Sequence, residues 1–214
     1  IVDGWLEGLT SSEVVQKVSQ AGSPSLIGMS CYRFNLDPAG EIVRETRDRF
    51  GNIPVIGGGY GPTFHAELFL EKGFTVAVKG EAEHIIVPLV QSLLRGSDLS
   101  QIPGIAFRKE GGGVVHTQQT APVVDLDQIP FPARDAVQHT MQQGNLVHLC
   151  TARGCEAHCL FCSIFAFALG GSKTTRWRQR SITNIVDEVE ILHDRYGATC
   201  FKFVDDRFIE PPRD

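Results

Sequence analysis

The fold is decided around residues 53–64, which read IPVIGGGYGPTF. The mainly apolar residues 53–56 predict a short buried strand, and the glycine-rich run after them predicts a loop. Residues 65–72 then predict a helix. A strand that passes through a loop into a helix is one repeating unit of an α/β fold, so the same alternation is expected on both sides.

Strand and helix signals do alternate along the first half of the chain. Strands are predicted at residues 25–30, 53–56 and 74–78, and helices at 10–21, 38–50, 65–72 and 85–94. This spacing favours a parallel sheet with right-handed crossovers. We therefore predict a doubly wound, Rossmann-like α/β domain over residues 1–124, which ends in a hairpin around the glycines at 111–113.

Three loops leave the carboxyl ends of the predicted strands, where parallel sheets bind ligands. Adjacent glycines in the second loop permit positive φ and let a bulky ligand approach the backbone. A flexible surface turn would have the same composition, so the glycines leave both interpretations open. The candidate ligand-binding residues are Ser30, Cys31, Tyr32, Gly57, Gly58, Gly59, Tyr60, Thr63, Gly80 and Glu81.

A second motif places Cys155, Cys159 and Cys162 in the spacing C-x3-C-x2-C. One short loop with this spacing supplies three thiolates to a [4Fe-4S] cluster and leaves the fourth iron open. The alternative is a zinc site of the three cysteines and His158, although His158 is adjacent to Cys159, which makes joint ligation awkward. A disulfide is disfavoured because three clustered cysteines leave one unpaired.

The cysteine loop lies near the start of a second predicted domain, residues 144–214, which follows a linker at 125–143. A strand at 147–151, a helix at 182–196 and a strand at 200–204 predict the opening β/α units of a TIM-type barrel. Chemistry in such barrels gathers at the carboxyl ends of strands, where Asp205 also lies; a solvated turn is the plainer interpretation of that residue. Arg178 and Arg180 are expected to be surface charges, with a role at the cluster as the alternative.

Composition limits the classes of function. The chain has 214 residues and a formal charge of −5, which argues against a general nucleic-acid-binding surface. The longest apolar run is far shorter than the roughly 20 residues that span a bilayer, so no membrane partner is expected. Six cysteines without a signal peptide fit a reducing cytoplasm. The start at Ile1 and the stop at Asp214 suggest that both ends are incomplete.

The two halves together resemble one family. The cysteine motif with Phe161 just before its third cysteine resembles the radical S-adenosylmethionine (SAM) superfamily, and the segments at 28–30, 57–58 and 80–83 resemble the cobalamin-binding domain that precedes many radical SAM domains. The linker is similar to the segment that joins these domains. The resemblance implies an enzyme that uses a [4Fe-4S] cluster, SAM and cobalamin.

The resemblance also implies roles for particular residues. The ten loop residues named above would line the cobalamin site, with Cys31 or Tyr32 facing the cobalt or packing beneath the ring. The motif D-x-H-x-x-G, which supplies a histidine to cobalt in other B12 domains, does not occur in the chain, and it would follow a strand expected to lie before Ile1. Because the radical SAM branch of the family commonly lacks such a ligand, the resemblance implies cobalamin without a histidine ligand. Phe161 and Asp205 would approach SAM, and the three cysteines would bind the cluster. The alternative role of Arg178 and Arg180 would be at the cluster or at the SAM carboxylate.

In that family, the adenosyl radical abstracts hydrogen from the substrate and methylcobalamin donates a methyl group. The resemblance therefore implies a methyltransferase that acts on an unactivated carbon or phosphorus of a small molecule or peptide, with a flavodoxin- or ferredoxin-type electron donor. Relatives that catalyse cyclisation or ring rearrangement are the first alternative. A module that binds cobalamin or a metal without catalysis is the second.

Overall fold

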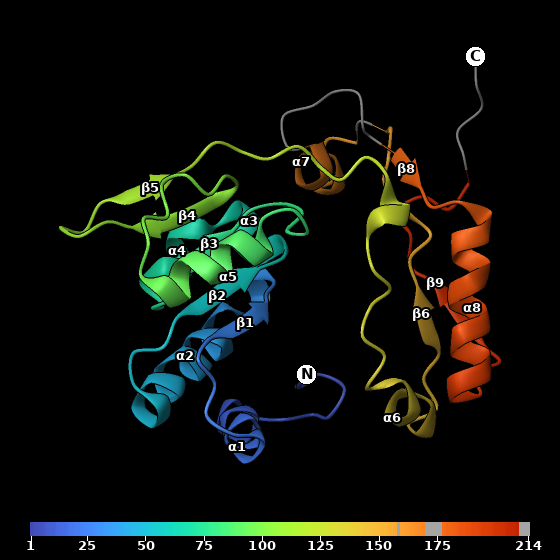
Figure 1. Ribbon diagram of the computed structural model, residues 1–214, viewed down its shortest axis with the longest axis horizontal. Helices are drawn as coiled ribbons and strands as arrows, with labels where there is room; N and C mark the ends of the chain where they lie inside the picture. The colour runs from blue at the N-terminus through green and yellow to red at the C-terminus, as the bar shows by residue number, and fades with distance from the viewer. Residues whose placement is uncertain (158, 170–176, 210–214) are drawn as a thin grey trace. The chain divides into compact units, whose positions relative to one another are not determined.

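The computed structural model describes residues 1–157, 159–169 and 177–209 (Figure 1). The chain divides into two compact units, Val2–Ala121 and Pro122–Asp214. The segment predicted as a linker, residues 125–143, belongs to the second of them.

The first unit is built on a five-stranded sheet in the order β1-β2-β3-β4-β5. The first three strands, β1 to β3, run parallel to one another, whereas β4 is antiparallel to both β3 and β5. The strands are β1 (Ile27–Ser30), β2 (Val55–Gly58), β3 (Val76–Val78), β4 (Ile105–Arg108) and β5 (Val114–His116). The predicted α/β class is confirmed. The predicted hairpin extends the same sheet, which makes the sheet mixed.

Helices connect and cover these strands. They are α1 (Ser11–Ala21), α2 (Leu36–Phe50), α3 (Tyr60–Phe64), α4 (Ala66–Glu71) and α5 (Ile86–Arg95), with a 3-10 turn η1 (Arg33–Asn35) before α2. Thr10 caps α1 through a reciprocal capping box with Glu13, because each side chain accepts a hydrogen bond from the other residue's backbone N–H. Helix α1 lies along α2, where Ser12 Oγ donates to Glu45 Oε1 at 2.8 Å.

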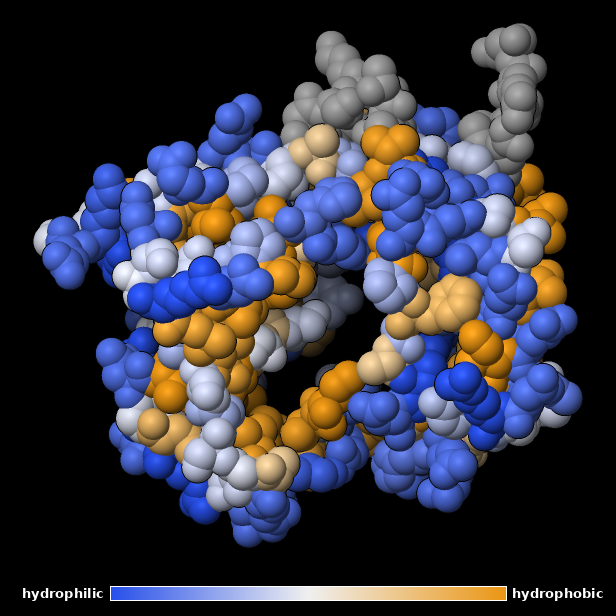
Figure 2. Space-filling model, in the orientation of Figure 1, coloured by the Kyte–Doolittle hydropathy of each residue, from blue (hydrophilic) through white to orange (hydrophobic). Residues whose placement is uncertain are grey.

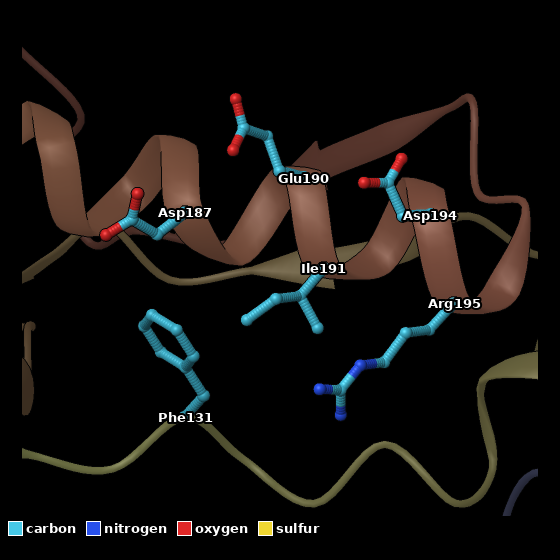
Figure 3. A pocket seen from close by; sticks show the side chains of 6 residues that line it. All are labelled: Phe131, Asp187, Glu190, Ile191, Asp194 and Arg195. Atoms are coloured by element: carbon cyan, nitrogen blue, oxygen red, sulfur yellow. The ribbon is translucent and has the colours of Figure 1, made fainter.

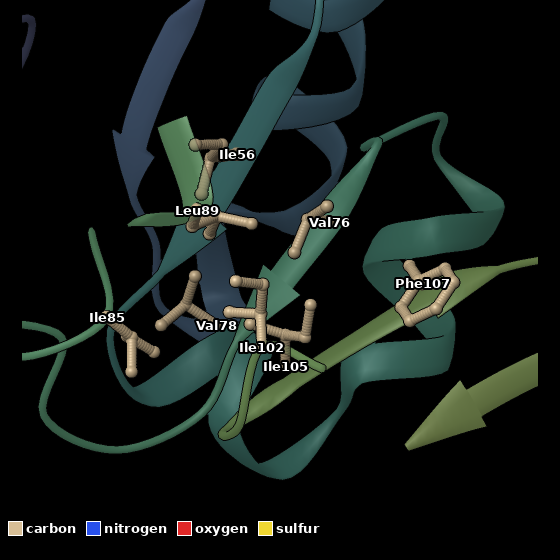
Figure 4. Close-up of a cluster of buried hydrophobic side chains, with 8 residues drawn as sticks. All are labelled: Ile56, Val76, Val78, Ile85, Leu89, Ile102, Ile105 and Phe107. Atoms are coloured by element: carbon tan, nitrogen blue, oxygen red, sulfur yellow. The ribbon is translucent and has the colours of Figure 1, made fainter. Parts of the chain in front are cut away.

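Alternation along the strands divides the core between the two faces of the sheet. Ile56, Val76 and Val78 pack with Leu89 of α5 on one face (Figure 4). Val55, the neighbour of Ile56, packs on the other face in the cluster that contains the α2 residues. The central strands are buried on both faces, as expected for parallel strands between helical layers.

The second unit contains one parallel strand pair, β6 (Val147–Leu149) with β9 (Phe201–Phe203), joined through α8 (Ile182–Tyr196). This confirms the predicted strand, helix and strand in that order. An antiparallel pair, β7 (Ala152–Gly154) with β8 (Trp177–Gln179), was not predicted. The remaining elements are η2 (Leu126–Gln128), α6 (Val137–Gln142) and α7 (Ile164–Leu169).

The surface is consistent with the mixed composition of the chain. Hydrophilic side chains cover much of the face shown in Figure 2, with hydrophobic areas between them. Among the described residues, no helix combines the length and apolar character needed to cross a membrane.

Candidate functional site

In the first unit, the loops after β1 and β2 are joined through their backbones. Cys31 N–H donates to Gly58 O at 2.8 Å, and Gly61 N–H donates to Cys31 O at 2.8 Å. These bonds continue the β1–β2 ladder past the ends of the strands. The two loops therefore form one continuous edge at the carboxyl ends of the strands.

The glycines of this edge do not have equal surroundings. A Cβ on Gly59, whose φ is +89°, would lie 3.0 Å from Cys31 O, and a Cβ on Gly61 would lie 2.6 Å from the ring of Phe69. A Cβ on Gly57 would lie 2.9 Å from the ring of Phe74. A Cβ on Gly58 would meet nothing within 4 Å. Three of the four glycines thus permit close internal packing, whereas Gly58 borders open space.

Thr63 connects the second loop to the third. Its hydroxyl donates to Gly59 O at 2.7 Å and accepts a hydrogen bond from Gly80 N–H at 3.0 Å. Gly80 has a φ of +74°, the left-handed conformation that favours glycine. Since its hydroxyl is used inside the protein, Thr63 holds the loops together.

Four aromatic side chains form a stack on the same edge. The rings of Tyr32 and Phe34 are 5.2 Å apart between centroids and nearly parallel, and those of Tyr32 and Tyr60 are 5.9 Å apart and also nearly parallel. Phe64 lies 6.3 Å from Tyr60 in a tilted arrangement. Phe34 is 76% exposed and Tyr32 is 48% exposed, so this stack offers apolar area to a ligand.

The remaining candidates of the first unit differ in exposure. Cys31 is 1% exposed and belongs to the hydrophobic core, where burial raises the pKa of its thiol to about 12. Its sulfur is therefore turned away from the ligand edge, although its backbone forms part of it. Ser30 is exposed, with its hydroxyl beside Gly59, and Glu81 is partly exposed. Phe34 and Phe64 were not among the candidates from the sequence. The feature that could have identified them is the presence of an aromatic residue in each of two neighbouring segments that follow the carboxyl ends of strands.

In the second unit, Asp205 binds the chain that leads into the cysteine loop. Its Oδ1 accepts hydrogen bonds from Thr151 N–H at 2.5 Å and Ala152 N–H at 2.8 Å, and its Oδ2 accepts one from Thr151 Oγ1 at 2.7 Å. Both carboxylate oxygens are thus used inside the unit.

Asp206 accepts a hydrogen bond from Gly154 N–H at 3.1 Å, one residue before Cys155. Burial raises the pKa of Asp206, an effect opposed by this hydrogen bond and reinforced by the charge of Asp205. The two carboxylates therefore lie directly behind the residues that open the cysteine loop.

The cysteine loop itself is exposed. Cys159 is exposed, Cys155 and Cys162 are partly exposed, and all three are free thiols. Phe161 is 93% exposed. Within the described part of the chain, no three His, Cys, Asp or Glu side chains converge as a site for a metal ion. The donor set suits an iron–sulfur cluster, and the structure does not bring its three sulfurs to one point; His158 of the zinc alternative lies outside the described residues.

Arg178 and Arg180 are not the surface charges expected from the sequence. Arg178 is 5% exposed, and its Nη1 donates to Val123 O at 2.6 Å. Arg180 Nη1 pairs with Glu188 Oε2 at 2.5 Å, and Arg134 pairs with the other oxygen of this buried glutamate. Sequence periodicity alone does not reveal such burial, because the segment around Arg134 has to fold back against α8.

An open groove lies elsewhere on the second unit, between Phe131 and the outer face of α8 (Figure 3). It is lined by Phe131, Asp187, Glu190, Ile191, Asp194 and Arg195. None of these residues was a candidate from the sequence, and none belongs to the cysteine loop.

Comparisons with known proteins find similarity in both halves of the chain. Residues 6–90 match the B12 binding domain family. An uncharacterized methyltransferase from Pyrococcus horikoshii is 30% identical over 213 residues, which make up 97% of this chain and 45% of that protein. An anaerobic magnesium-protoporphyrin IX monomethyl ester cyclase from Synechocystis is 28% identical over 96% of this chain and 41% of that protein.

A solved structure extends the likeness to both units. The radical SAM methyltransferase TsrM from Kitasatospora setae, with cobalamin and a [4Fe-4S] cluster bound, superposes with a TM-score of 0.71 at 25% identity. The match covers 96% of this chain and 42% of TsrM. The chain thus spans less than half the length of these proteins.

Proposed function

We propose that this chain, which belongs to the family of radical SAM enzymes with a B12-binding domain, binds cobalamin on its first unit and a [4Fe-4S] cluster on its second. The complete protein is then a methyltransferase acting on an unactivated carbon or phosphorus of a small molecule or peptide. In such an enzyme the cluster and SAM supply the radical chemistry, while cobalamin carries the methyl group.

The observation that carries the cobalamin proposal is the edge formed by the first two loops. It combines an exposed aromatic stack with the open space beside Gly58. A corrin ring is broad and its tail is long, so it requires both an apolar area and a close approach to the backbone. The match of residues 6–90 to the B12 binding domain supports the same ligand.

Gly58→Val tests this proposal with little damage to the fold. Its side chain would point into open space at the end of a strand, where a β-branched residue is well tolerated. We expect cobalamin affinity to fall at least about tenfold, because the new side chain occupies space next to the ligand edge. Absorbance titration with hydroxocobalamin measures the affinity, and unchanged binding would contradict the site.

The cluster proposal rests on the spacing of Cys155, Cys159 and Cys162 and on the likeness to cluster-containing relatives. Phe161 would pack beside the bound cofactors, and Asp205 lies behind the loop. Anaerobic reconstitution with iron and sulfide, followed by iron analysis, tests it. A colourless protein that binds zinc and no iron would favour the alternative of a non-catalytic metal- or cobalamin-binding module.

A second candidate activity is cyclisation, favoured by the similarity to the Synechocystis cyclase. The nucleoside products of SAM distinguish the two activities. A methyltransferase of this kind yields S-adenosylhomocysteine and 5′-deoxyadenosine together, because one SAM donates the methyl group and another the radical. A cyclase yields 5′-deoxyadenosine without stoichiometric S-adenosylhomocysteine. Chromatography of both nucleosides with the full-length enzyme decides between them.

The proposed chemistry also requires an electron. We propose a flavodoxin- or ferredoxin-type protein as its donor, with neither nucleic acid nor a membrane as a partner, and a cytoplasmic location. The formal charge of −5 supports the exclusion of nucleic acid. Photoreduced flavodoxin that supports SAM cleavage by the full-length enzyme would support this donor, and dependence on a membrane fraction would contradict it.

A further inference from the structure

We infer that Asp205, Asp206 and Arg207 act together as a clamp that positions the cysteine loop, with Asp205 as its principal positioning residue. This inference rests on the proposed cluster. The three residues lie just after β9, separated from it by Val204, and each contacts a different part of residues 151–156.

Asp205 holds the first part of that segment. Its carboxylate accepts two backbone hydrogen bonds, from Thr151 and Ala152, together with one from the Thr151 hydroxyl. Hydrogen bonds to a charged acceptor stabilise a structure more than hydrogen bonds between neutral groups. Because both oxygens are engaged, the carboxylate has a defined orientation behind the loop.

The next two residues hold the part nearest the cysteines. Asp206 accepts a hydrogen bond from Gly154 N–H at 3.1 Å, and Arg207 forms an ion pair with Glu156, which lies between Cys155 and Cys159. Arg207 O also accepts a hydrogen bond from Trp177 Nε1 at 2.8 Å, which fixes the clamp to β8.

The other side of the same segment is held by β8 and its neighbours. Arg180 N–H donates to Thr151 O at 2.9 Å, and the guanidinium of Arg180 donates to Cys150 O at 2.9 Å. Cys162 N–H donates to Cys159 O at 3.0 Å inside the exposed loop. Outer contacts of this kind orient metal ligands, so the clamp would set the direction in which the loop leaves β7.

Two substitutions at Asp205 separate positioning from a role that requires charge. In Asp205→Asn the amide oxygen can still accept from both backbone N–H groups, and the amide nitrogen can donate to the Thr151 hydroxyl after that hydroxyl rotates. Asp205→Ala loses all three bonds. A positioning residue therefore tolerates Asn and not Ala, whereas a carboxylate that binds the SAM ammonium group by charge tolerates neither.

The experiment uses the full-length protein with and without reconstituted cluster. For Asp205→Ala we expect iron to be lost to a chelator about 10- to 100-fold faster than from wild type, as for other residues that support metal ligands. Asp205→Asn should lie within about threefold of wild type, and its SAM affinity should be unchanged. Glu190→Ala, which removes a carboxylate from the exposed face of α8, is the matched control.

Hydrogen exchange of the metal-free protein provides a readout that does not depend on the cluster. The Thr151 and Ala152 amides should exchange at least tenfold faster in Asp205→Ala and near the wild-type rate in Asp205→Asn. If the wild-type protein binds no iron, the proposed function is contradicted. The hydrogen-exchange measurement still tests whether Asp205 positions residues 151–152.

The inference would be overturned if Asp205→Ala exchanged its amides and retained iron at the same rates as the wild-type protein. Loss of iron retention in both Asp205 variants would also overturn it, because charge and not positioning would then be required. If Asp205→Ala does not fold, Thr151→Val and Asp206→Ala each remove a single bond. Faster exchange of the 151–154 amides in both would support the clamp, and wild-type exchange in both would overturn it.

Discussion

The two candidate sites of this protein are built in opposite ways. The loops of the first unit are bonded to each other through Cys31, Gly58 and Gly61, and core side chains fill the space beside their glycines. The cysteine loop of the second unit is exposed, and Asp205, Asp206 and Arg207 hold its base from outside. The first site is shaped by hydrogen bonds between its loops and by core packing, whereas the second has a fixed base and an open loop.

The difference follows from the kind of ligand proposed for each site. Cobalamin would bind through many weak contacts over a large area, so a preformed edge avoids the cost of ordering that area on binding. A cluster binds through a few strong bonds to thiolates, and those bonds can supply the free energy that orders a loop. The second site therefore needs only a well-packed frame at the base of the cysteine loop, because cluster binding can order the loop itself.

Removal of a single thiolate should break the second site completely. Cys155→Ala, Cys159→Ala and Cys162→Ala should each abolish SAM cleavage, since a second iron then lacks a protein ligand. Cys200→Ala is the control, because Cys200 is an exposed cysteine outside the motif. Iron content after anaerobic reconstitution and the yield of 5′-deoxyadenosine measure the effect, and full activity in any of the three variants would refute the cluster.

The frame of the second unit should depend on its buried glutamate. Glu188 is 1% exposed and pairs with Arg134 and Arg180, so Glu188→Ala leaves two guanidinium groups without the carboxylate that balances their charge. We expect a loss of about 3–5 kcal/mol in the free energy of unfolding of this unit. Urea denaturation followed by Trp177 fluorescence measures it. Glu190→Ala should change the stability little, and equal losses in the two variants would argue against the network.

Substitution of two glycines of the first unit should change its stability to different extents. Gly61→Ala places a Cβ 2.6 Å from Phe69 and 2.9 Å from the Tyr32 backbone, which should cost about 1–3 kcal/mol. Gly58→Ala meets no neighbour within 4 Å and should stay within about 0.5 kcal/mol of wild type. Thermal unfolding of both variants measures the difference. Equal stabilities would mean that the edge is looser than the packing indicates.

The smallest expected effect is a loss of stability of the first unit at alkaline pH. Burial raises the pKa of Cys31 in the folded state to about 12, whereas the pKa of an unfolded cysteine is about 8.5. Between these values the unfolded chain releases a proton that the folded state retains, so stability falls as the pH rises through about 9. From pH 8 to about pH 9.3 we expect a loss of about 1 kcal/mol that is absent in Cys31→Ala. Identical pH profiles for the two proteins would contradict this assignment.

The sequence by itself determined the alternation of elements and the place of the candidate sites. The apolar run 53–56 predicted β2, because a buried parallel strand is a local pattern in the chain. The loop predicted over residues 57–64 was wrong in part, since β2 continues to Gly58 and helix α3 begins at Tyr60. The spacing of Cys155, Cys159 and Cys162 is equally local. The same holds for the N-caps of α1 and α8, where Thr10 and Ser181 accept hydrogen bonds from N–H groups three residues later.

Only the tertiary structure decided which side chains are used inside the protein and which are left for a ligand. Cys31 and Tyr32 are neighbours in sequence, yet the sulfur lies in the core and the ring lies in the exposed stack. Asp205 binds Thr151 across 54 positions of sequence, and the largely buried guanidinium of Arg180 pairs with Glu188, which also pairs with Arg134. These outcomes depend on contacts between distant segments, which local periodicity does not encode.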